Sequence, residues 1–186
     1  MYFLIILYYI FVLLPSSIFE NIYYITKYSQ KSFKNAREQI KHIKYRLRDN
    51  LSMAKDEVIN FHYVNDRPLF KGLTINYIPL STVIILNNGG DCSVLARLYK
   101  RLCKWQGLKA QLYIMYDAAA SGFIEKLKTM HVFCICKNER YYTSYNASSI
   151  MKDSKKEVLI DEIKEARYII NSEPYYFKNA KIHKWR

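Results

Sequence analysis

Apolar residues recur along the chain with different spacings, and each spacing predicts a different kind of segment. The first 19 residues contain no charged side chain, and residues 2–14 are apolar or aromatic throughout. Between residues 30 and 62 the apolar positions return every three or four residues, which is typical of one face of a helix. Residues 157–170 have the same helical spacing. Three segments are predicted as strands: 108–116, 130–137 and 140–146.

The helical segment 30–62 is both amphipathic and basic. Asp49 and Asn50 interrupt its apolar stripe, and they either break the helix or cap a second one. We interpret this segment as a helix that packs on a domain or joins it to a membrane. Contact of its basic face with lipid or nucleic acid is the alternative. The basic residues of this region are Lys27, Lys31, Lys34, Arg37, Lys41, Lys44, Arg46 and Arg48.

Residues 88–107 form the segment around which the rest of the chain is organised. Gly89 and Gly90 predict a tight turn, and Asp91 is a good N-cap for a helix that ends at Gly107. The apolar side of this helix is formed by Leu95, Leu98, Tyr99 and Leu102, and the basic side by Arg97, Lys100, Arg101 and Lys104.

Cys92 falls in the first turn of this predicted helix. Free backbone N–H groups and the positive end of the helix dipole lower the pKa of a thiol placed there, which favours the nucleophilic thiolate. The alternative is a buried structural cysteine at a loop-to-helix junction. We therefore treat Cys92 as a candidate nucleophile whose role depends on its partners.

The uncharged N-terminal segment has three interpretations. A spanning helix needs ~20 apolar residues, and residues 2–19 nearly reach that length despite the interruption at Pro15. We prefer an uncleaved membrane anchor, place a secretory signal peptide second, and a buried core segment third. The basic residues that follow then put the body of the protein on the cytoplasmic side, and secretion is the second choice.

The net charge and the cysteines give limited information about binding partners, disulfides and metal sites. The net charge of +13 is spread along the chain, and no nucleic-acid motif appears, so nucleic acid is not the expected partner. The four cysteines are Cys92, Cys103, Cys134 and Cys136. We expect Cys103, Cys134 and Cys136 to be buried free thiols, because the spacing of the four cysteines gives no disulfide framework. A zinc site at His131 lacks a fitting fourth ligand, so no metal is expected.

The predicted hairpin of residues 130–146 carries the sharpest hypothesis. If Asn138 and Glu139 form its loop, His131 lies directly opposite Asn146 on the same face, with Cβ atoms ~4.5–5.5 Å apart. An asparagine oxygen that accepts the imidazole N–H fixes the tautomer and orientation of a catalytic histidine. A half-exposed histidine beside a polar neighbour is the alternative. Ser144 is the substitute partner if the register slips.

These residues resemble the transglutaminase-like superfamily of papain-like cysteine enzymes. The resemblance covers about residues 73–150 and rests on Gly90-Asp91-Cys92, Gly107-Leu108-Lys109-Ala110, His131-Val-Phe, and Tyr142-Thr-Ser-Tyr-Asn146. It implies a nucleophile at Cys92, a base at His131 and an orienting residue at Asn146. The family usually has Asp at this last place, although papain-type enzymes use Asn.

The resemblance implies an α+β fold in which a helix carrying Cys92 packs on an antiparallel sheet. We divide the chain into an anchor or signal segment (1–26), a basic helical region (27–66), a transglutaminase-like core (67–150), and a C-terminal helix with a basic aromatic tail (151–186).

The implied activity is thiolate attack on a peptide or glutamine amide, giving hydrolysis or amide transfer. A protein or peptide is therefore the expected substrate, with membrane association through residues 2–19. The Cys92 backbone N–H, with a side chain from Asn87 or Asn88, is the candidate oxyanion hole. No cofactor is implied. The alternative is a catalytically inactive relative that serves as a membrane-anchored binding or structural protein.

Overall fold

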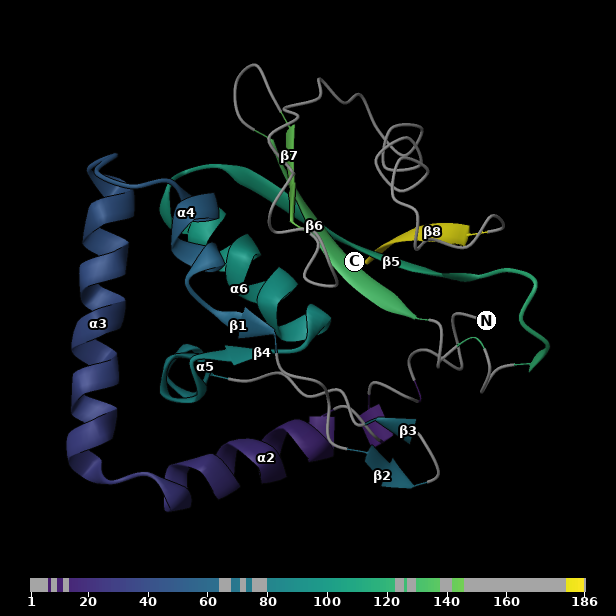
Figure 1. The fold of residues 1–186 in the computed structure, drawn as a ribbon, viewed down its shortest axis with the longest axis horizontal. Helices are drawn as coiled ribbons and strands as arrows, with labels where there is room; N and C mark the ends of the chain where they lie inside the picture. Colours follow the sequence, from purple (N-terminus) through teal and green to yellow (C-terminus); the bar gives the residue numbers. More distant parts are fainter. Residues whose placement is uncertain are drawn as a thin grey trace.

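The computed structural model describes residues 7, 10–11, 14–63, 68–70, 73–74, 80–122, 126, 130–137, 142–145 and 180–185. Its helices are α2 (Leu14–Lys27), α3 (Gln30–Arg48), α4 (Ala54–Ile59), α5 (Ser81–Asn87) and α6 (Cys92–Trp105). Its strands are β1 (His62–Tyr63), β2 (Pro68–Phe70), β3 (Leu73–Thr74), β4 (Gly89–Gly90), β5 (Lys109–Asp117), β6 (His131–Lys137), β7 (Tyr142–Tyr145) and β8 (Ala180–Trp185). Figure 1 shows their arrangement, and the fold class is α+β as expected.

The main sheet has four antiparallel strands in the order β7-β6-β5-β8. Strands β5 and β6 pair along the whole of β6, from Met115 opposite His131 to Lys109 opposite Lys137. Strand β8 pairs with the other edge of β5. Two further small sheets consist of the parallel pair β1-β4 and the antiparallel pair β2-β3.

Helix α6 packs against one face of the main sheet and is covered on its other side by α4 and α3. Alternation along the strands separates the two faces of the sheet. The face toward α6 carries Leu112, Val132, Cys134 and Cys136 in the main core, with Ala110 and Ile114 partly buried against them. The predicted strands and the expected shared face of Cys134 and Cys136 are thus confirmed.

The opposite face of the sheet carries a smaller apolar cluster. Met115, Phe133 and Ile135 are buried in it, and Tyr113 and Ile182 pack against them. Tyr113 and Phe133 are directly opposite one another, with ring centroids 5.5 Å apart. Ile182 belongs to β8, so the last described strand contributes to this cluster.

The long helical segment breaks where its apolar stripe is interrupted. Helix α3 ends at Arg48, and Asn50 adopts a positive φ of 54° before α4 begins. Arg46 of α3 then reaches Glu57 of α4, whose side chain is 6% exposed, with 2.8 Å between nitrogen and oxygen. Both helices contribute to the main core through residues that include Leu47 and Val58, so this core contains residues that precede 67.

Gly89 and Gly90 serve a purpose other than the predicted tight turn. They form strand β4, which pairs with β1 through His62 opposite Gly89 and Tyr63 opposite Gly90. A Cβ atom at Gly89 would overlap with the backbone carbonyl of His62, and one at Gly90 would overlap with the Val94 side chain. Glycine is therefore required at both positions, because β1 approaches the backbone of β4 closely and the start of α6 approaches Gly90. The contact with β1 is long-range, so the local sequence pattern did not reveal it.

Three sequence-based expectations lie wholly or largely outside the described residues. The N-terminal anchor falls mainly on residues 1–13, of which only Leu7, Ile10 and Phe11 are described; helix α2 begins at Leu14. The predicted helix 157–170 and residue Asn146 also fall outside. Within the part of the chain that is described, no helix combines the length and the apolar character needed to cross a bilayer.

The close approach at Gly89 generates a stability prediction. Gly89→Ala should lower the free energy of unfolding by about 1–3 kcal/mol, because the added methyl must push β1 away from β4. Asn88→Gly, one residue earlier, is the control: Asn88 is exposed with φ 50°, a conformation that glycine adopts readily. Urea denaturation measures both. Equal unfolding midpoints for Gly89→Ala and the parent protein would contradict this packing.

Candidate active site

Helix α6 begins as the sequence predicts. Asp91 is its N-cap, and the Asp91 Oδ1 atom accepts a hydrogen bond from the Val94 backbone N–H at 2.7 Å. Cys92 follows as the first helical residue and is partly buried. The backbone N–H groups of a helix's first turn have no partner within the helix. The Cys92 thiol therefore lies where a developing negative charge is stabilised by backbone dipoles.

The end of α6 is also the predicted one. Gly107 has φ 81°, the Leu108 N–H bonds to the Cys103 carbonyl at 2.8 Å, and the Gly107 N–H bonds to that of Lys104 at 3.1 Å. This pair of bonds is a Schellman motif, in which glycine takes the left-handed position just after the helix. The chain then enters β5 directly, which fixes α6 against the strand that follows it.

A contact between two buried thiols aligns α6 with β6. Cys103, near the end of α6, is hydrogen-bonded to Cys136, near the end of β6. Burial raises the pKa of Cys134, and the charge of Lys100, one turn earlier in α6, opposes this shift; Cys134 is also earlier in β6. Strand β5 follows α6 after the turn at Gly107 and is antiparallel to β6. The helix and the strand therefore run in the same direction.

This alignment brings the starts of α6 and β6 to the same end of the domain. Cys92 precedes Cys103 by eleven residues, a distance of ~16 Å along a helix. His131 precedes Cys136 by five residues, a distance of ~17 Å along a strand. The two residues therefore lie at nearly the same level.

The alternation of β6 places His131 on the far face of the sheet from α6. His131 is an odd number of residues from Cys136 and pairs with Met115, which belongs to the cluster on the opposite face. It is also the first residue of β6 and is partly buried. A contact between its imidazole and the Cys92 thiol would have to pass around the start of the strand.

The predicted register of the hairpin is wrong by two residues. Lys137 pairs with Tyr142, whereas a two-residue loop of Asn138 and Glu139 would place Lys137 opposite Arg140. The connection therefore spans four residues, 138–141, because pairing begins two residues later on the second strand. The offset is even, so each described residue of β7 keeps its predicted face of the sheet, but the described pairs end with Cys134 opposite Tyr145 and do not include His131. Asn146 lies outside the described residues, and the substitute Ser144 pairs with Ile135.

The two oxyanion candidates have different surroundings. Asn87 is the last residue of α5, and its Oδ1 atom accepts a hydrogen bond from the Tyr28 hydroxyl at 2.9 Å. This bond leaves its side-chain NH₂ group as the available donor. Asn88 is exposed, and its backbone carbonyl accepts the His62 N–H at 2.9 Å. Both residues lie on the short path from α5 to Cys92.

His62 is a candidate that sequence reasoning missed. Strand β1 holds it opposite Gly89, three residues before Cys92. A strand of two residues has no recognisable periodicity in the sequence. Only the pairing of β1 with β4 in the structure shows that His62 lies close to the segment before Cys92. Asp91 is also unusual: its side chain is buried, and its Oδ2 atom has no hydrogen-bond partner among the described residues.

The other three cysteines are buried in the main core and are free thiols, as expected. The hydrogen bond to Cys136, together with burial, raises the pKa of the Cys103 thiol. Burial also raises the pKa of the Cys134 thiol. The described residues contain no group of three side chains arranged to hold a metal ion.

In comparisons with known proteins, no family model, curated protein or solved structure matches the chain.

Burial predicts the order in which the thiols react. A charged, water-soluble thiol reagent should modify Cys92 in the folded protein, whereas Cys103, Cys134 and Cys136 should react only in denaturant. Burial excludes the reagent from these three, and the raised pKa of Cys103 and Cys134 keeps both thiols protonated at neutral pH. Mass spectrometry of the peptides measures the rates, with Cys92→Ser as control. Native labelling of Cys134 as fast as Cys92 would contradict the burial described.

Proposed function

We propose that this protein is a cysteine enzyme of the transglutaminase-like, papain-like class, with Cys92 as nucleophile and His131 as base. The observation that carries the proposal is the alignment of α6 and β6 by the Cys103–Cys136 contact. This alignment brings the helix start that bears Cys92 and the strand start that bears His131 to one end of the domain.

The order of the elements supports the same proposal. The resemblance in sequence implies a helix with the nucleophile, then a strand, then a strand that starts with the base, then a strand that ends near the orienting residue. Helix α6 and strands β5, β6 and β7 follow in that order, and the three strands are neighbours in the sheet. Asn146 directly follows the last residue of β7, Tyr145.

The chemistry begins with transfer of the thiol proton to His131. The Cys92 thiolate then adds to the carbonyl carbon of a peptide or glutamine amide. The resulting oxyanion accepts hydrogen bonds from the Cys92 backbone N–H and the Asn87 or Asn88 side chain. His131 gives its proton to the leaving amine, the C–N bond breaks and a thioester remains. Water or a second amine, deprotonated by His131, then releases the acyl group.

A catalytically inactive relative that binds a partner at a membrane is the second candidate. The alternation of β6 favours it, because it places His131 on the sheet face that carries Met115. The enzyme proposal requires the imidazole to turn toward α6 at the first residue of the strand. The two candidates therefore differ in whether His131 is essential.

Substitutions in the triad test the proposed roles. Cys92→Ala should abolish turnover of a peptide or glutamine-amide substrate, and His131→Ala should lower it by roughly 10²–10⁴-fold, the usual contribution of a positioned acid–base group. Asn146→Ala should cost less, because it loosens the imidazole without removing it, and Asn146→Asp should retain substantial activity. Thermal melts check that each variant folds.

The other histidines provide matched controls. His183→Ala removes an imidazole that stacks on Tyr116 at 5.5 Å in the same sheet, and it should leave turnover unchanged. His62→Ala tests the histidine nearest the path into Cys92. A folded His131→Ala variant with full activity, combined with an inactive His62→Ala variant, would transfer the role of base to His62. Full activity in both would reject His131 and His62 as the base.

A further inference from the structure

Helix α2 has its polar side toward the domain and its apolar side toward solvent. Asn21 bonds through Oδ1 to the Leu80 backbone N–H at 2.9 Å, and Tyr28 just after the helix bonds to Asn87 at 2.9 Å. Leu80 directly precedes α5 and Asn87 is its last residue, so the two contacts lie at opposite ends of α5. Asn21 and Tyr28 are seven residues apart, as are Leu80 and Asn87. Helices α2 and α5 therefore lie side by side and run in the same direction. Ser17, one turn before Asn21, is the buried residue of α2. Polar groups therefore attach α2 to the domain.

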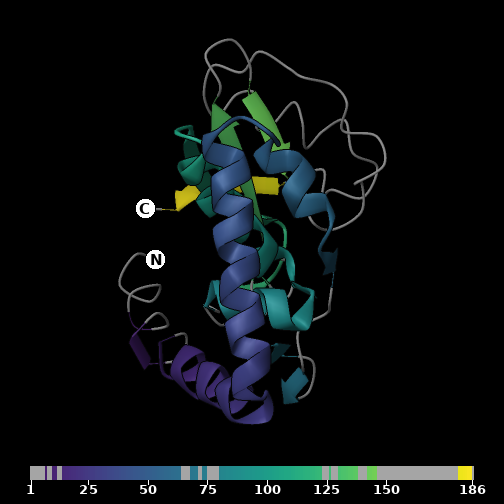
Figure 2. The same ribbon diagram turned by 90° about the vertical axis from the view of Figure 1, so that its left-hand side faces the viewer.

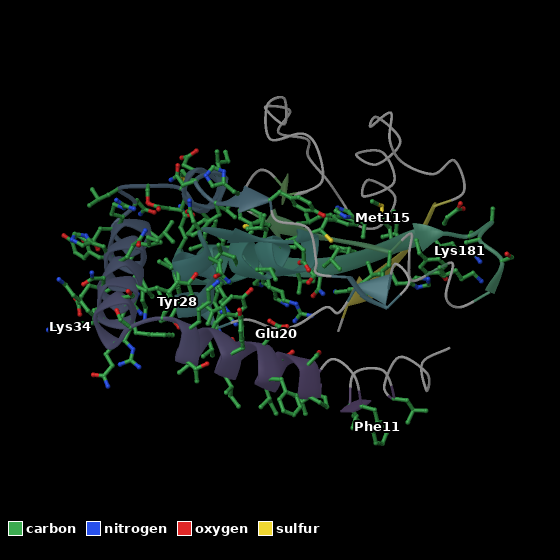
Figure 3. The ribbon with its side chains drawn as sticks, turned by 60° about the horizontal axis from the view of Figure 1, so that its bottom comes forward. Phe11, Glu20, Tyr28, Lys34, Met115 and Lys181 are labelled. Carbon is green, nitrogen blue, oxygen red and sulfur yellow. The ribbon has the colours of Figure 1, made fainter. Side chains whose placement is uncertain are left out.

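The outward side of α2 is an apolar stripe that nothing in the described structure covers. Its members are Leu14, Ile18, Phe19, Ile22, Tyr23 and Ile25, with Phe19 72% and Ile22 52% exposed. In Figure 3, Tyr28 and Glu20 lie on the domain side of α2, whereas Phe11 points to the opposite side. Ordinary surface helices bury such a stripe, and contiguous exposed stripes mark interaction sites.

The end of α2 carries the residues that favour a membrane–water boundary. Tyr23 and Tyr24 make an edge-to-face contact, and Tyr24 stacks on Tyr28 with centroids 6.4 Å apart. The Lys27 ammonium lies 5.7–6.0 Å from the centroids of all three rings. The exposed Tyr23 and Lys27 side chains combine an apolar body with a polar tip, which suits the headgroup level of a bilayer, whereas Tyr28 is bonded to Asn87 on the domain side.

We propose that α2 docks in the plane of an anionic lipid membrane, with its apolar stripe in the headgroup–acyl boundary. The sequence before α2 is uncharged and apolar, a composition that is compatible with lipid contact. The residues that follow α2 are basic, which complements anionic headgroups. A stripe that reaches Ile25 extends beyond the segment 2–19 considered as an anchor, and it requires a helix that lies along the surface.

This orientation limits which basic residues can reach the lipid. Helix α3 rises away from the end of α2, as Figures 1 and 2 both show. Lys31 and Lys34 lie within ~6 Å of the start of α3, whereas Lys41 is ~16 Å and Arg48 ~27 Å along it. Electrostatic attraction falls off over ~8 Å at physiological salt. Among the basic residues of α2 and α3, Lys27, Lys31 and Lys34 should therefore contribute most.

Tryptophan substitutions in the full chain test the docking directly. Phe19→Trp, Ile22→Trp and Ile25→Trp should each show a blue-shifted emission and quenching by brominated lipids on vesicles of phosphatidylcholine and phosphatidylserine. Their quenching should be similar, because an in-plane helix holds them at one depth. Leu51→Trp is the control: Leu51 is 65% exposed but lies between α3 and α4, so it should remain unquenched. The parent protein supplies the background from Trp105 and Trp185.

The outcomes separate the possible occupants of the stripe. Quenching that falls from Phe19→Trp to Ile25→Trp would overturn the in-plane orientation in favour of a spanning segment. A blue shift without vesicles that grows with protein concentration would assign the stripe to a second copy of the chain. A blue shift without vesicles that is independent of concentration would assign it to another segment of the same chain. The second and third outcomes reject the membrane proposal.

Binding strength provides an independent measurement. The triple variant Ile18→Ser, Phe19→Ser, Ile22→Ser should bind these vesicles more weakly, by roughly tenfold or more for each side chain removed. Because all three are exposed, its melting temperature should match that of the parent protein. Tyr45→Ser, Leu51→Ser, Ile59→Ser removes three exposed apolar side chains elsewhere and should bind normally. Equal vesicle binding by both triple variants would overturn the proposal.

A charge comparison tests the orientation. Lys27→Gln, Lys31→Gln, Lys34→Gln should weaken vesicle binding more than Lys41→Gln, Lys44→Gln, Arg48→Gln, although both variants lose the same charge. The difference should disappear on vesicles of phosphatidylcholine alone. An equal loss in both variants would contradict a helix α3 that rises from the membrane.

Discussion

The burial of helix α6 is the constraint on which the rest of the structure depends. Four consecutive residues near its start, Ser93–Ala96, are all buried, so neighbours enclose the first turns of the helix on every side. The sheet covers one side, and α3 and α4 cover another. Because a helix enclosed in this way cannot shift without opening the core, its first residue, Cys92, has a fixed position relative to the strands.

The same constraint explains the two glycines before α6. The chain must enter a buried helix through a narrow space between His62 and Val94, and only a residue without a Cβ atom fits there. Helix α5 leads into this passage and is itself held by α2 through Asn21 and Tyr28. A connected set of contacts thus joins the proposed membrane-facing helix to the start of α6. The proposed site would then open near the lipid surface on which α2 lies.

Features set by local chemistry were predictable from the sequence. The limits of α6 follow from Asp91 and Gly107, the break after α3 follows from Asp49 and Asn50, and the alternating residues of β5 identify its buried face. The α+β class was implied by the resemblance, and the observed helices and antiparallel sheet agree with it.

Features set by long-range contacts were not predictable. The pairing of β1 with β4 and the place of β8 beside β5 depend on residues far apart in the chain. The hairpin register failed because the sequence 138–141 allows more than one loop length, and two residues of offset change every pair. Only the first part of the α2 stripe, up to residue 19, belongs to the predicted anchor segment 2–19. The polar inner side of α2, at Ser17 and Asn21, can be recognised only from the contacts with α5.

The central claim is that the Cys92 thiol and the His131 side chain meet at the common end of α6 and β6. Cross-linking of Cys92 to a cysteine introduced by His131→Cys tests it most directly, with dibromobimane, which fluoresces strongly only when it bridges two thiols. We predict rapid bridging in the folded protein and none for His183→Cys, in which the new thiol lies on β8. A folded His131→Cys protein whose two thiols each react singly without bridging would contradict the claim and leave the inactive relative as the better description.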